Sequence, residues 1–176
     1  MARYAQDRFV NVELVTNITS GLKIPNSAIT KKEFYQIPGI YRTTGGDSNS
    51  YGVLREVLKS DGTMTTEFVS VTLYRDPQEE TADGELPSYY YVDMSELEAG
   101  DVLVAADSQS RFTVRDTGSL KGVYRLNLGY AVFRPIEILD QNDEFTIIAD
   151  GTSYGVDRYD YIAADASAVV ENQIME

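Results

Sequence analysis

The sequence predicts an all-β protein made of small β-barrel or sandwich units. Apolar residues alternate with polar ones over short stretches, which is the spacing that turns one face of a strand toward a core. The 176 residues include 13 Tyr and 6 Phe, and aromatic and β-branched residues favour strands. No window of about twelve residues has apolar side chains at helical spacing. Many short strands separated by turn signals indicate a barrel or sandwich.

The expected strands follow one another closely. Phe9–Val15 is the first, because its Val and Leu residues alternate with polar ones. Gly52–Leu58 and Thr65–Tyr74 form a hairpin, because Lys59–Gly62 between them ends in Asp-Gly, and Gly tolerates the positive φ of a tight turn. The later strands are expected at Ser88–Met94, Asp101–Ala105, Arg111–Val114, Gly122–Asn127, Tyr130–Leu139, Glu144–Ala149 and Asp160–Ala163.

Two stretches are predicted to be loops, because neither holds enough apolar residues to be ordered by burial. Thr43–Ser50 is small and polar, and Asp76–Ser88 is acidic with two prolines. Ser95–Leu97 is a candidate for a short helical turn.

Three pairs of segments resemble each other in the same order along the chain. Genuine duplication and chance similarity between β-rich segments both account for this. Duplication predicts two related β units in tandem, at residues 21–108 and 109–176. The pairs are Phe68–Tyr74 with Phe133–Leu139, Tyr89–Asp93 with Glu144–Ile148, and Val102–Asp107 with Asp160–Asp165.

Composition excludes several kinds of chemistry. The chain has 15 Lys and Arg against 28 Asp and Glu, a net charge of −13, and no Cys, His or Trp. The charge argues against nucleic acid and anionic membrane surfaces as partners. Without Cys or His there is no thiolate nucleophile, no Ser–His pair and no imidazole or thiolate metal site. We therefore expect no enzymatic activity and no cofactor.

The chain carries no obvious membrane or export signal. No stretch of about 18 apolar residues is present, and the residues after Met1 lack the apolar region of a signal peptide. The sequence is thus expected to be either cytosolic or a piece of a longer protein.

Acidic and aromatic clusters give the candidate sites. Ca²⁺ could bind the acidic residues of 76–85, but their spacing matches no EF-hand, so a solvated loop is favoured. Asp140–Glu144 is interpreted as a β-turn. Paired carboxylates could hydrolyse glycosides, although sequence cannot place two of them across a cleft. The acidic residues of 76–85 are Asp76, Glu79, Glu80, Asp83 and Glu85.

Tyr89, Tyr90 and Tyr91 are a candidate interface patch, and alternation along a strand should place at least one of them in the core.

Three ordered stretches resemble HlyD-like membrane fusion proteins, also called periplasmic adaptors, of the Gram-positive type. Ser20–Ile29 is similar to the start of their membrane-proximal domain, and Leu97–Val104 to a glycine–aspartate turn before an apolar strand. Gly122–Ala163 follows their closing order of strands. Gly151–Asp160 departs from the family pattern, which has Gly-Asp at this turn. The motif residues are Ile24, Pro25, Ser27, Ala28, Gly100 and Asp101.

The resemblance implies a non-catalytic, extracytoplasmic fragment of an adaptor that is membrane-anchored in its full-length form. Residues 1–20 would then be the last strand of a truncated preceding β-barrel. The fragment would dock to a membrane transporter and to itself in an export assembly, and could be monomeric when isolated. The alternatives are a free-standing cell-surface β-rich module that binds carbohydrate or protein, and a carboxylate-dependent hydrolase.

Overall fold

The computed structural model describes residues 20–46, 49–79, 85–127 and 129–171. This part of the chain is all-β, which confirms the predicted fold class. Three short 3₁₀ turns, η1 (Asn26–Ala28), η2 (Gly39–Tyr41) and η3 (Ala166–Ala168), accompany the strands. The strands are β1 (Leu22–Pro25), β2 (Thr30–Pro38), β3 (Thr43–Gly45), β4 (Ser50–Leu58), β5 (Met64–Ser70), β6 (Tyr89–Val92), β7 (Val102–Val104), β8 (Arg111–Thr113), β9 (Thr117–Asn127), β10 (Tyr130–Pro135), β11 (Ile138–Gln141) and β12 (Phe145–Ile148).

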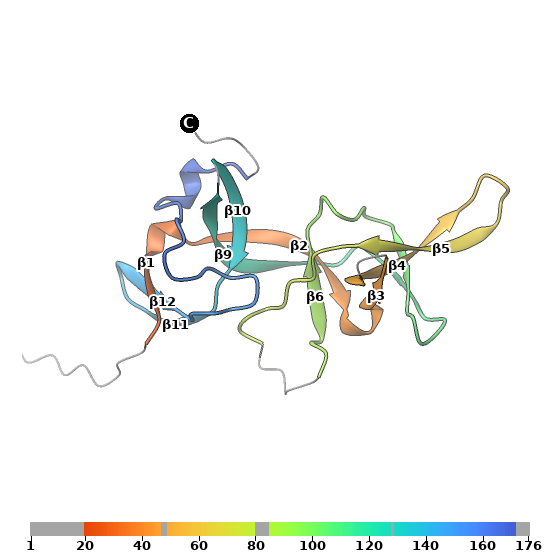
Figure 1. Ribbon diagram of the computed structural model, residues 1–176, viewed down its shortest axis with the longest axis horizontal. Helices are drawn as coiled ribbons and strands as arrows, with labels where there is room; N and C mark the ends of the chain where they lie inside the picture. The colour runs from red at the N-terminus through yellow and green to blue at the C-terminus, as the bar shows by residue number, and fades with distance from the viewer. Residues whose placement is uncertain (1–19, 47–48, 80–84, 128, 172–176) are drawn as a thin grey trace, which may run out of the picture.

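The strands form three sheets, and every pairing between them is antiparallel. One sheet has the order β1-β12-β11, and a second has the order β10-β9-β2-β6. The third has the order β3-β4-β7-β8, with β5 paired to β4. The first and third sheets lie at opposite ends of an elongated molecule, and the second runs between them (Figure 1).

The long strands β2 and β9 join two lobes. We call strands β3–β8, with the paired ends of β2 and β9, the first lobe. The second lobe consists of β1, β10–β12, the far half of β9 and residues 149–171. We call the stretch over which β2 and β9 pair with each other the ribbon. It runs from Thr30 opposite Gly122 to Tyr35 opposite Thr117. Because both strands continue from one lobe into the other, the lobes form one body (Figure 1).

Each lobe has its own apolar core, and a smaller aromatic cluster lies between them. The first-lobe core includes Ile37, Val53 and Leu103, and the second includes Val123 and Ile148, all buried. The middle cluster, set on the ribbon, contains Phe34, Leu120 and Phe133, with Tyr74, Tyr91 and Tyr124 packed against it. Burial at three places along its length is consistent with a single elongated folding unit.

The predicted hairpin is confirmed. β4 pairs with β5 from Gly52 opposite Ser70 to Leu58 opposite Met64. Gly62 in the turn has φ of +83°, and the side chain of Asp61 accepts a hydrogen bond from the backbone N–H of Thr63. The Asp-Gly signal therefore gave both the position and the chemistry of this turn.

Several other expectations are corrected. The predicted strand Tyr130–Leu139 is divided into β10 and β11, because Pro135 has no N–H with which to extend the ladder. Thr65–Tyr74 likewise ends its pairing with β4 at Ser70, and Tyr74 instead bridges Tyr91 in another sheet. Asp160–Ala163 is not a strand and makes a single bridge through Ile162.

Other differences concern segments without a clear alternating pattern. The sequence did not predict β2, and it assigned β3 to a loop. Ser95–Leu97 is a turn without helix, in which Asp93 accepts a hydrogen bond from the N–H of Ser95. The expected strand Phe9–Val15, within residues 1–20, lies outside the described residues.

The two lobes repeat the same local design. In each, a strand ending in Ile-Pro enters a 3₁₀ turn: Pro25 precedes η1 and Pro38 precedes η2. Ile24 pairs with Thr146 in β12, as Ile37 pairs with Tyr90 in β6. Strand β12 therefore stands in the second lobe where β6 stands in the first.

The hairpins β4–β5 and β9–β10 correspond as well. A Cβ added at Gly52 would meet the carbonyl oxygen of Val69 at 2.2 Å, and one added at Gly122 would meet that of Arg134 at 2.4 Å. Each glycine also lies against a phenylalanine ring of the partner strand, Phe68 or Phe133. This match follows the first segment pair of the sequence repeat, whereas the second and third pairs are shifted by one residue in the structure.

The lobes are interleaved along the chain. β1 lies before residue 108 but pairs with β12, and the ribbon half of β9 lies after residue 108 but pairs with β2. The predicted boundary between 108 and 109 therefore does not coincide with a boundary between sheets. The first lobe is inserted into the second between β1 and β9.

Candidate functional site

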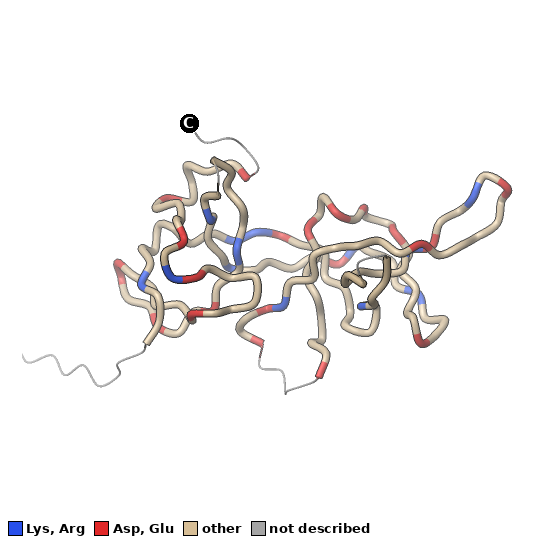
Figure 2. The backbone as a smooth tube through the Cα atoms, viewed as in Figure 1, with Lys and Arg blue, Asp and Glu red and all other residues tan. Residues whose placement is uncertain are grey.

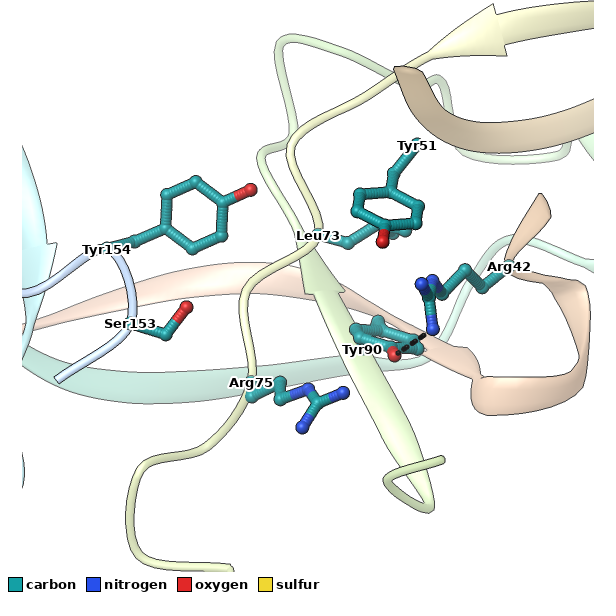
Figure 3. Close-up of a pocket in the computed structure, with 7 residues that line it drawn as sticks. All are labelled: Arg42, Tyr51, Leu73, Arg75, Tyr90, Ser153 and Tyr154. Atoms are coloured by element: carbon teal, nitrogen blue, oxygen red, sulfur yellow. Dashed lines mark hydrogen bonds between the residues drawn. The ribbon is translucent and has the colours of Figure 1, made fainter. Parts of the chain in front are cut away.

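A pocket of about 180 Å³ lies where the first lobe meets the loop after β12. Arg42, Tyr51 and Tyr90 line one side, Ser153 and Tyr154 from the second lobe line the other, and Leu73 and Arg75 lie between them (Figure 3). We call this the Arg/Tyr pocket.

Two aromatic rings position Arg42. Its guanidinium carbon lies 4.1 Å from the centroid of the Tyr51 ring, which is a cation–π distance. Its Nη1 also donates to the hydroxyl of Tyr90 at 3.4 Å, a long hydrogen bond (Figure 3). Tyr90 is only 3% exposed, so its position is fixed by the core. Arg42 is therefore held in one orientation while most of its five N–H donors remain available.

Arg75 supplies the second positive charge. It follows Leu73 and Tyr74, and its guanidinium carbon lies 5.8 Å from the ring centroid of Tyr90. Neither Arg75 nor Arg42 has an ion pair with a carboxylate in the part of the chain that the structure describes. The pocket thus holds two guanidinium groups that no ion pair among the described residues neutralises.

The loop that completes the pocket is held by backbone and ring contacts. Tyr154 has φ of +59°, and its ring lies edge-on to that of Tyr74 with centroids 5.4 Å apart. Arg134 donates from Nη1 to the carbonyl oxygen of Tyr154 at 3.5 Å. Arg134 therefore holds Tyr154 within the second lobe, and the ring contact packs Tyr154 on Tyr74, which bridges Tyr91 of the first lobe.

At the corresponding positions of the second lobe, side chains are hydrogen-bonded to one another. Thr146 corresponds to Tyr90, and Gln141, which pairs with Thr146, corresponds to Arg75. Both donate to the side-chain oxygen of Asn26, at 2.7 Å from Thr146 and 3.3 Å from Gln141. Because Gln141 stands in the second lobe where Arg75 stands in the first, the strand arrangement itself does not require an arginine at this place.

Sequence reasoning missed the Arg/Tyr pocket. Its residues come from five separate segments, and no local motif links them. The sequence repeat could not have revealed it, because its segment pairs contain neither Arg42 nor Arg75.

The structure separates the three tyrosines of the predicted interface. Tyr90 lies in the core, as strand alternation predicted, whereas Tyr89 is 45% exposed. Tyr91 is half-buried, meets Phe34 edge-on and accepts a hydrogen bond from Gln36 at 3.1 Å. The interface role of these residues stays a prediction, for which Tyr89 is the accessible member.

The residues of the family-like motif have structural partners. Ile24 and Ala28 are buried, and Pro25 ends β1 before η1. The hydroxyl of Ser27 donates to the carbonyl oxygen of Ala164 at 2.6 Å. Gly100 has φ of +101°, and Asp101 accepts a hydrogen bond from the N–H of Glu98.

The acidic residues do not converge. Within the described ranges, no three Asp or Glu side chains are grouped so that they could hold a metal ion. Glu79 accepts a hydrogen bond from the N–H of Ser88, while Glu80 and Asp83 lie outside those ranges. Of residues 140–144, which were predicted to be a β-turn, Asp140 and Gln141 belong to β11, and the turn to β12 covers residues 142–144. In it Asn142 accepts hydrogen bonds from the N–H groups of Glu144 and Phe145. Figure 2 shows Asp and Glu along the whole molecule.

No protein-family model, curated protein or solved structure matches the chain. Among the described residues, no helix has the length and apolar character needed to cross a bilayer.

Proposed function

We propose that this chain is a non-catalytic docking module of an extracytoplasmic adaptor, anchored to a membrane in its full-length form. Its partners are a membrane transporter subunit and further copies of itself. The observation that carries the proposal is the repeated plan of the two lobes, which β2 and β9 fuse into one elongated body (Figure 1). Such a body presents a long surface on which protein partners can lie side by side.

The charged residues near the centre of each lobe support a role in holding shape. Arg55 contacts Asp101, and Arg125 contacts Asp160, so these charges are used inside the fold. On the ribbon, Lys32 pairs with Asp93 and Glu171. The resemblance of the motif residues to membrane fusion proteins supports the same proposal.

Exposed tyrosines supply the contact chemistry. Tyr89 is exposed in the first lobe, and Tyr159 and Tyr161 are exposed in the second. Tyrosine is enriched at protein interfaces, because its ring buries a large area while its hydroxyl keeps a hydrogen bond. These positions are therefore the best places to look for partners.

Photo-crosslinking in the intact protein, in its native membrane, tests the proposal. A photoreactive residue replaces Tyr89 or Tyr159 in one variant each, and the exposed, non-aromatic Lys59, in the turn between β4 and β5, serves as the control position. We expect adducts with a second copy and with a transporter subunit at Tyr89 or Tyr159, and weaker adducts at Lys59. Equal labelling at all three positions, or no membrane partner, would contradict the proposal.

The second candidate is a cell-surface module that binds a ligand, and the Arg/Tyr pocket favours it. This candidate needs neither a transporter nor self-association. The carboxylate-dependent hydrolase stays a prediction.

A further inference from the structure

We propose that the Arg/Tyr pocket binds a small organic acid, with its carboxylate on Arg42 and Arg75 and its body between the rings of Tyr51 and Tyr154. This inference does not rest on the docking proposal, because it concerns a ligand of one chain and not a contact between proteins. Crosslinking could fail while the pocket binds its ligand, and the reverse also holds.

The charge of the ligand follows from the two arginines. In the described part of the chain neither has a carboxylate partner, and both line the same pocket (Figure 3). A guanidinium offers a planar fork of donors that matches a carboxylate with two parallel hydrogen bonds. The hydroxyls of Tyr90 and Ser153, at the same pocket, can serve the second oxygen.

A carboxylate fits these walls better than a phosphate does. Phosphate sites commonly use a glycine-rich loop or successive backbone N–H groups. The Arg/Tyr pocket is lined mostly by arginine and tyrosine side chains, without glycine or lysine among its lining residues. Two guanidinium groups on an aromatic base suit one planar anion.

The tyrosines indicate the body of the ligand. Tyr51 and Tyr154 are each about half exposed, and they stand on opposite sides of the pocket (Figure 3). Their ring faces can pack on a flat aromatic ring or on the C–H groups of a sugar ring. The volume of about 180 Å³ is below the usual range for drug-sized ligands, so the bound part is about one ring in size.

The neighbouring grooves allow a longer ligand to continue. A shallower groove of about 460 Å³ shares Tyr51 and Tyr154 with the Arg/Tyr pocket, and another of about 220 Å³ shares Arg75 and Ser153. Glu96 lies in the first groove, and the second is lined by Asp76, Glu79 and Glu137. Carboxylates on both sides confine the anionic group to the arginines in the centre.

Nuclear magnetic resonance titration of the 176-residue chain tests the inference. The probes are glucuronate, a sugar acid, and 3-phenylpropionate, an aromatic acid. Glucose and 3-phenylpropionamide are their neutral controls, and inorganic phosphate is the competing anion. We expect one of the two acids to shift the backbone amide signals of residues around Arg42, Arg75 and Ser153, whereas the neutral controls do not. The acid that binds identifies the kind of ring that the tyrosines accept.

Binding of the acid by variants of the two pocket arginines is the second test. Arg42→Gln and Arg75→Gln should each weaken binding of the acid by about tenfold or more. Arg115→Gln, a change of an exposed arginine outside the pocket, should leave binding unchanged. The inference is overturned if neither acid binds, if neutral controls or phosphate bind as well as the acids, or if both pocket variants bind like the wild type.

Discussion

Asp160 occupies in the second lobe the position that Asp101 occupies in the first. Each carboxylate contacts an arginine of the central hairpin, at 3.4 Å for Arg55 with Asp101 and at 3.5 Å for Arg125 with Asp160. Each also accepts a hydrogen bond at 3.0 Å from the N–H three residues earlier in the chain. Both lobes therefore use the same pair of contacts, in which one carboxylate joins a turn of the backbone to an arginine on a strand.

Removing either carboxylate should weaken its own lobe. Asp101→Ala and Asp160→Ala each delete an acceptor of one backbone N–H and the partner of an arginine. We expect each to lower the free energy of unfolding by about 1–3 kcal/mol in urea denaturation. Asp107→Ala, at an exposed turn, is the control and should change little. An equal effect of all three variants would contradict the role assigned to the two carboxylates.

Substitutions of the residue before each carboxylate should change the stability of the chain in opposite directions. Gly100 has φ of +101°, and Tyr159 has φ of +78°. Left-handed backbone costs a non-glycine residue about 1–2 kcal/mol, and Tyr159, at 91% exposed, buries little in return. Tyr159→Gly should therefore leave the chain as stable or up to about 1 kcal/mol more stable, whereas Gly100→Ala should destabilise it by about 1–2 kcal/mol. Thermal unfolding of the two variants measures the contrast, and destabilisation of both would refute it.

The turn at Tyr159 also shows where sequence comparison failed. The pattern expected Gly-Asp within Gly151–Asp160, and the structure places Tyr159-Asp160 where the first lobe has Gly100-Asp101. The backbone conformation is kept although the residue that favours it is not. A residue-type pattern therefore could not align the two lobes, whereas φ and hydrogen bonds do.

Some strands could be predicted from the sequence and others could not. β4 and β5 were predicted because alternation and an Asp-Gly turn are local signals. β2 was not, because its first half, residues 30–33, is polar and the strand crosses from one lobe to the other, so no single apolar face runs along it. The Arg/Tyr pocket is less predictable still, since its walls meet only through the packing of two lobes.

Close backbone approach at Gly122 gives a third prediction. A Cβ there would lie 2.4 Å from the carbonyl oxygen of Arg134 and equally near the ring of Phe133. Since backbone cannot move aside as a side chain can, Gly122→Ala should destabilise the chain by about 1–3 kcal/mol. Ser119→Ala, at an exposed position of the same strand, is the control. A Gly122→Ala variant with wild-type stability in urea would show that β9 and β10 are less closely packed.

Lys32 ties the ribbon to both lobes. Its ammonium group lies 2.5 Å from a carboxylate oxygen of Asp93, also pairs with Glu171, and faces the ring of Phe34. Glu171 in turn accepts a hydrogen bond from the backbone N–H of Phe133. Lys32→Met should leave two partly buried carboxylates side by side and cost about 1–3 kcal/mol of unfolding free energy near neutral pH. Lys121→Met, at an exposed position of β9, is the control.

The effect of Lys32→Met should also depend on pH. Burial alone would raise the pKa of Asp93, but hydrogen bonds from Lys32 and Ser95 outweigh it and hold the pKa below its ordinary value. Burial likewise opposes the charge of Lys32, but Asp93 and Glu171 raise its pKa above the ordinary value. A lowered carboxylate pKa stabilises the fold above the unfolded-state pKa, and this contribution is lost as the pH falls through the folded-state pKa.

For Lys32 the sign is reversed, since its contribution is present below the unfolded-state pKa and is lost as the pH rises through the raised value. The stability difference between wild type and Lys32→Met should therefore be largest between about pH 5 and pH 10. It should shrink below about pH 4, because protonated Asp93 no longer pairs with the ammonium group. Urea denaturation of both proteins across this range measures the difference. A difference as large at pH 3 as at pH 7 would show that Lys32 stabilises the ribbon by packing and not by charge.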